Sequence, residues 1–102
     1  LVNENAANGL PLNASALPIT GRNVTGIVVA VATGEITITY AAAASGQTLV
    51  LAPRDGANPL SGTATESTVP TNMIVWNCNA AGSTKGGGAG SLPARFAPAE
   101  CR

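Results

Sequence analysis

The sequence contains no histidine, and its 102 residues include only three aromatic side chains, Tyr40, Trp76 and Phe96. Its five basic and five acidic residues balance, and the basic ones form no cluster of the kind that binds nucleic acid. No apolar run reaches the roughly 18 residues of a membrane-spanning helix, and no signal segment is present. Since the chain begins at Leu1 rather than Met, we expect an N-terminal portion to have been removed.

Groups suited to catalysis are also scarce. Ser83 and Lys85 are close in sequence, but a lysine needs burial to act as a base, and a glycine-rich loop offers little. Residues 82–88 lack the order of glycines and lysine that defines a phosphate-binding loop. The carboxylates are dispersed along the chain. The sequence therefore predicts no enzyme, no metal and no cofactor.

The two cysteines stand at informative places. Cys78 ends an apolar stretch, and Cys101 is the penultimate residue. Two cysteines without histidine favour a disulfide formed in an oxidising compartment, the alternative being two separate buried thiols. A bridge closing a loop of this length would stabilise the fold by about 3 kcal/mol in the chain-entropy model.

Alternation of apolar and polar residues predicts a mainly β fold, a single domain over residues 1–102. We expect a four-stranded antiparallel sheet within 24–78, with strands at 24–32, 35–40, 48–52 and 73–78, the third ending at Pro53. Thr33 and Gly34 suggest a tight hairpin turn. Residues 1–23 are interpreted as an approach loop with at most one frayed helical turn, 54–72 as a long loop, and 79–102 as a cystine-closed loop whose tip, 85–90, is mobile and faces solvent.

One face of this sheet would be apolar, and we expect nothing in the chain to cover it, because the loops are too polar. A face of this kind must be buried against another layer. We therefore expect it to bind a helix from outside this chain. The residues predicted to form this interface are Ile36, Ile38, Tyr40, Leu49, Leu51, Ile74 and Trp76.

Four segments together resemble the globular head of type IV pilins: GEITITY at 34–40, GQTLVLAP at 46–53, IVWNC at 74–78, and the Leu92-Pro93 and Cys101-Arg102 pairs near the end. In that family a four-stranded sheet packs on a long N-terminal helix, and a second cysteine closes the C-terminal D-region. The resemblance extends over about residues 9–102.

The resemblance implies a structural subunit of an extracellular, bacterial pilus-like filament, exported through the periplasm. The head would form the outer layer over a core of helices and contact other pilin subunits. The helix itself is missing here, which favours a split pilin whose helix is a separate short hydrophobic chain, with a removed N-terminal helix of the same pilin as the alternative.

Two other functions stay open: a pseudopilin-like component of a secretion system, and a free-standing secreted binding module. Related secretion pseudopilins bind Ca²⁺ in a comparable loop, and here Asp55, Asn58 and Glu66 share the loop region that would supply such ligands. Asn13 and Asn23 begin sequences that match N-glycosylation acceptors, but the bacterial origin that the resemblance implies favours unmodified asparagines.

Overall fold

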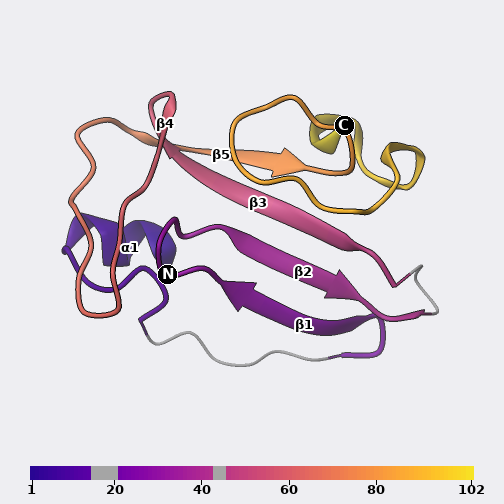
Figure 1. Ribbon diagram of the computed structural model, residues 1–102, viewed down its shortest axis with the longest axis horizontal. Coiled ribbons are helices and arrows are strands. Elements are labelled where there is room, and N and C mark those ends of the chain that lie inside the picture. Colours follow the sequence, from indigo (N-terminus) through magenta and orange to yellow (C-terminus); the bar gives the residue numbers. More distant parts are fainter. Residues whose placement is uncertain (15–20, 43–45) are drawn as a thin grey trace.

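Within the described residues, five antiparallel strands form one curled sheet, the two-residue β4 being additional to the four that were predicted, with a short helix near the N-terminus and two 3-10 turns near the C-terminus (Figure 1). The computed structural model describes residues 1–14, 21–42 and 46–102. The elements are α1 (Val2–Ala7), β1 (Val24–Val29), β2 (Ile36–Tyr40), β3 (Thr48–Asp55), β4 (Asn58–Pro59), β5 (Ile74–Asn79), η2 (Ala94–Phe96) and η3 (Ala99–Cys101). The predicted mainly β fold and the Cys78–Cys101 disulfide are both confirmed. The predicted approach loop and the motif at 13–15 extend into residues 15–20, outside the described residues.

β3 is the central strand. It pairs with β2 through residues 48–51, with β5 through residues 50–55, and with the two-residue β4 at its end. The prediction that Pro53 ends this strand is wrong. β2 pairs no further than Leu51, so on that side Pro53 has no neighbouring strand, and a proline is tolerated where a strand is locally an edge.

The turn between β1 and β2 is wider than the predicted two-residue hairpin. The Ala30 amide donates to the Glu35 carbonyl at 2.9 Å, and the Gly34 amide donates to the Ala30 carbonyl at 2.7 Å. β1 consequently ends at Val29, before the expected position 32. Gly34 adopts a positive φ of 73°, as expected of a turn glycine.

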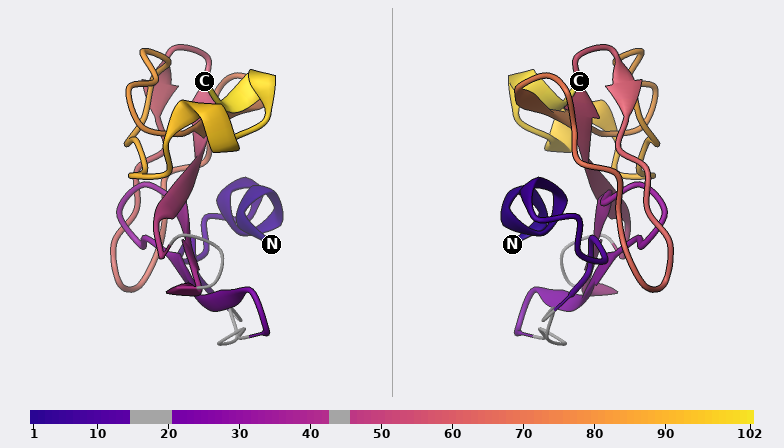
Figure 2. Two further views of the ribbon diagram at one scale, coloured as in Figure 1. Left: turned by 90° about the vertical axis from the view of Figure 1, so that its right-hand side faces the viewer. Right: turned by 90° about the vertical axis from the view of Figure 1, so that its left-hand side faces the viewer.

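The two faces of the sheet are covered differently. α1 and the C-terminal 3-10 turns lie on the same side of the sheet (Figure 2). On the other side, the segment 86–90 runs along β3, so that Gly90 lies against Thr48, Gly88 near Val50 and Gly86 beside the Arg54 guanidinium. The molecule is correspondingly thin, with principal extents of 38 × 28 × 15 Å.

Residues 86–89 are exposed, as predicted, but the segment lies along β3 rather than standing free of the sheet, and its mobility stays a prediction. The glycines allow the backbone to approach β3 so closely that a Cβ at Gly87 would overlap the Cβ of Ala52. Val50 and Ala52 are buried on this face as a result. The Gly88 amide also donates to Glu35 Oε1 at 3.0 Å, which ties the segment to the start of β2.

Gly87→Ala is expected to destabilise the fold by about 2–3 kcal/mol, because it combines overpacking against Ala52 with an unfavourable positive φ of 103°. Gly82→Ala is the matched control: Gly82 also has a positive φ, of 79°, but a Cβ there meets nothing within 4 Å. Measured by chemical denaturation, the control should lose only about 1 kcal/mol of its free energy of unfolding. Equal losses in both variants would show that the segment is not packed on β3.

Candidate functional site

The strand register places all seven residues of the predicted helix interface on one face of the sheet. Directly paired residues in an antiparallel sheet point to the same face, and the next pair on that face lies two residues along. Ile36 pairs with Leu51 and Ile38 with Leu49, while Pro53 pairs with Trp76. The same face, called here the apolar face, carries the following residues: Ile27, Val29, Ile36, Ile38, Tyr40, Leu49, Leu51, Pro53, Ile74, Trp76 and Cys78.

α1 covers one end of the apolar face. Val2 and Ala6 are buried with Leu12 and Leu60, and this cluster packs against Val29, Ile36 and Ile74. The expectation that nothing in the chain covers the face is thus wrong at this end. A six-residue helix is marginal on its own, and the contacts that stabilise this one come from distant parts of the chain.

Asn5 holds α1 to the segment that follows it. Its side chain is buried, and Nδ2 donates to the carbonyl oxygens of Leu12 at 3.2 Å and Ala14 at 3.0 Å. The sequence alone does not single out Asn5, because asparagines close to a glycine are also common in irregular loops.

The C-terminal turns cover the opposite end of the face. Leu49 is buried there with Ala80, Leu92, Ala97 and Cys101, and Tyr40 and Cys78 pack against them. The disulfide joins η3 to β5, and the Ala80 amide donates to the Cys101 carbonyl at 2.7 Å. This cover is thus fastened to the sheet both covalently and by hydrogen bonding.

The middle of the apolar face lies between these two clusters. Among the described residues, Ile38, Leu51 and Trp76 belong to neither of the two clusters. Ile38 and Leu51 are half-buried, and Trp76 is 36% exposed. Large apolar side chains left open together on one surface are typical of a binding site.

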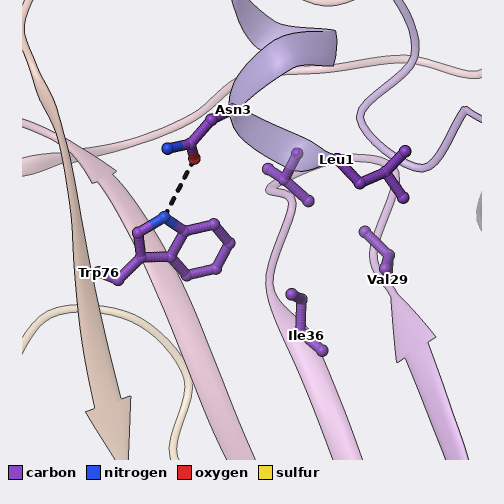
Figure 3. A pocket seen from close by; sticks show the side chains of 6 residues that line it. Leu1, Asn3, Val29, Ile36 and Trp76 are labelled. Carbon is purple, nitrogen blue, oxygen red and sulfur yellow. Dashed lines mark hydrogen bonds between the residues drawn. The ribbon is translucent and has the colours of Figure 1, made fainter.

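The middle of the apolar face, with Ile38, Leu51 and Trp76, is called here the open strip. A pocket of about 290 Å³ lies between α1 and this strip (Figure 3). Leu1, Val2, Val29 and Ile36 line it together with Asn3 and Trp76. The Trp76 indole Nε1–H donates to Asn3 Oδ1 at 3.0 Å, so its polar edge is satisfied while the ring stays on the apolar face. None of the six residues that line the pocket has an ionisable side chain, and five of them are apolar or aromatic.

Ser83 and Lys85 do not form a nucleophile–base pair, because the Ser83 hydroxyl accepts from the Lys85 backbone N–H, at 3.4 Å, and the Lys85 ammonium is bound elsewhere. Ser83 Oγ donates to Asn79 Oδ1 at 2.9 Å, and Lys85 Nζ donates to the backbone carbonyl of Glu100. Both contacts fasten the C-terminal loop.

The three residues considered as Ca²⁺ ligands are not assembled around one point. Asp55 and Asn58 face each other where β3 pairs with β4, whereas Glu66 lies in the turn closed by the Gly62–Ser67 bridge. Within residues 1–14, 21–42 and 46–102, no group of three or more acidic or cysteine side chains is placed to hold a metal.

Asp55 instead fastens the loop that precedes β5. Its carboxylate accepts the backbone N–H of Asn72 at 2.8 Å and of Thr71 at 3.2 Å. These donors, the Asn72 amide foremost, favour the ionised form and lower the pKa of Asp55 below its usual range.

Because its pKa is lower in the folded state, Asp55 stabilises the fold above its unfolded pKa of about 4, and this contribution is lost as the pH falls through the folded value. Asp55→Asn keeps one acceptor oxygen and removes the charge. We expect it to lower stability at pH 7 and to narrow the difference in denaturation midpoint between pH 7 and pH 3. A variant with the wild-type pH dependence would contradict this role.

By its fold, the chain is a thin, mainly β domain with a disulfide-closed C-terminal segment and one partly covered apolar face. Comparison with protein families matches the Pilin (bacterial filament) family over residues 2–102, and the chain belongs to that family. This family is structural and not catalytic, and membership implies assembly with other pilin subunits and an extracellular pilus location.

Comparisons with curated proteins and with solved structures found no match. Among the helices of the described part of the chain, none combines the length and apolar character needed to cross a bilayer.

Proposed function

We propose that this chain is the globular head of a type IV pilus-like filament subunit, and that the open strip of its apolar face binds an apolar helix. In the filament, heads form the outer layer over a core of packed helices. The observation that carries the proposal is the strip itself: Ile38, Leu51 and Trp76 lie on one face between two covered ends.

The position of α1 supports a helix in this place. The residues at its N-terminal end, Leu1 to Asn3, are those that line the pocket with the strands, while Ala6 packs among Leu12 and Leu60. In Figure 1 the N-terminus is correspondingly the end of α1 nearer the strands. A helix in line with α1 would extend over the open strip.

We propose further that a separate short polypeptide supplies this helix. The experiment expresses the head with a type IV pilin helix in two forms, as a separate chain and fused to Leu1, and looks for filaments by electron microscopy. Filaments containing the head in both forms are expected. Filaments from the fusion alone would overturn the separate chain, and no filaments in either form would overturn the pilus function.

A further inference from the structure

We propose that the exposed pair Arg95 and Phe96 docks onto a second copy of this chain, at a surface formed by Leu10, Val69 and the carboxylates of Glu4 and Glu66. The inference rests on the proposed filament function and specifies which surfaces of adjacent heads meet. It concerns a surface distinct from the apolar face.

The first surface is an aromatic side chain held against a cation. Phe96 is 61% exposed, and the guanidinium carbon of Arg95 lies 4.8 Å from the centroid of its ring. That distance is within the range of a cation–π contact. Aromatic side chains and arginine are the types enriched in the centres of protein interfaces.

Several hydrogen bonds hold this pair in place. The Phe96 amide donates to the Pro93 carbonyl at 2.9 Å, and Arg102 Nε donates to the carbonyls of Ala94 at 2.9 Å and Ala97 at 3.2 Å. The nearby disulfide of Cys101 fastens the segment to β5. A segment fixed before binding loses little conformational freedom when it docks.

The second surface joins two segments far apart in sequence. The Ser67 amide donates to the Gly9 carbonyl at 2.8 Å, and Ser67 Oγ donates to the Leu10 carbonyl, so these segments lie side by side. Leu10 is 47% exposed and Val69 is 53% exposed.

Two acidic residues lie near Leu10 and Val69 along the backbone. Glu4 in α1 and Glu66 in the turn before Ser67 are both exposed, and Asn8, beside Gly9, hydrogen-bonds through its side chain to the Glu4 carbonyl. The surface therefore offers apolar contacts for an aromatic ring and negative charge for a guanidinium. Its charge is complementary to that of Arg95.

The two surfaces lie at opposite ends of the molecule. α1 and the loop between β4 and β5 are at one end of the long axis, and the C-terminal turns, yellow in Figure 1, are toward the other. One molecule can therefore use both surfaces at once. A contact between two different surfaces of identical subunits repeats without closing when the rotation does not form a ring, which is how filaments grow.

The test engineers an intersubunit disulfide into assembled filaments. Phe96→Cys combined with Val69→Cys should give a ladder of crosslinked multimers after mild oxidation, with at least a tenfold greater yield than Phe96→Cys combined with Thr25→Cys. Thr25 is exposed on β1 and outside the proposed surfaces. Filaments that assemble without the ladder would overturn the inference and leave the filament function standing. Absence of filaments from the wild-type head and helix would instead overturn the proposed function.

A charge exchange covers the case in which the cysteine variants do not assemble. Arg95→Glu and Glu66→Arg should each lower the amount of filament at least tenfold, and the double variant should return it to within about twofold of wild type. Wild-type assembly of Arg95→Glu, or no recovery in the double variant, would overturn the inference.

Discussion

Ile38→Asp should weaken the binding of an apolar helix to the head at least 100-fold while the head itself stays folded. Ile38 is only half-buried in the chain alone, so a carboxylate there still reaches water. Once a helix covers the strip, the same carboxylate is buried against apolar side chains without a partner, at a cost of several kcal/mol. Titration of the head with the helix, followed by calorimetry, measures the loss.

Val28→Asp provides the matched control for this variant. Val28 lies on β1, beside the strand that carries Ile38, but the register places it on the opposite face, where it is exposed. Helix affinity should change less than twofold. If Ile38→Asp binds as tightly as wild type, or if Val28→Asp loses as much affinity, the helix does not bind at the apolar face.

Asn79→Ala should lower the free energy of unfolding by about 3 kcal/mol. Asn79 is fully buried, and its Nδ2 donates to the carbonyls of Gly86 at 3.1 Å and Gly88 at 2.9 Å, while its Oδ1 accepts from Ser83 Oγ. Truncation removes three hydrogen bonds made by a fully buried side chain, and each such bond contributes about 0.5–1.5 kcal/mol net. The segment that packs along β3 would lose its main attachment.

Asn77→Ala is the control, since its side chain also donates to the Gly86 carbonyl, at 3.1 Å, from a half-buried position two residues earlier. Asn77→Ala should lower the free energy of unfolding by less than about 1 kcal/mol, because water can replace the lost donor. Urea denaturation of both variants at pH 7 gives the comparison. Similar midpoints for the two variants would contradict the role assigned to Asn79.

The parts of the fold that follow from short-range sequence patterns were predictable. Alternation of apolar residues in 35–40 and 73–78 indicated two of the strands and the apolar face to which Ile38 and Trp76 belong. The number and placement of the cysteines indicated the disulfide. These features depend on residue spacing, which is visible in one sequence.

The features that were missed depend on contacts between distant residues. α1 is stabilised by burial of Val2 and Ala6 rather than by helix propensity. Glycines at 86–88 permit both a loose loop and a close approach to β3, and the local sequence does not distinguish these outcomes. The same holds for Asn79, which resembles any asparagine that ends a strand until the loop folds back over it.

The most direct test of the central claim uses the fluorescence of Trp76, the only tryptophan in the chain, which is 36% exposed on the open strip. A type IV pilin helix without tryptophan is titrated into the head, and the emission maximum is followed. The account predicts a saturable shift to shorter wavelength at one helix per head, as the indole loses its contact with water. An unchanged emission spectrum, from a head that binds the helix elsewhere or not at all, would contradict it.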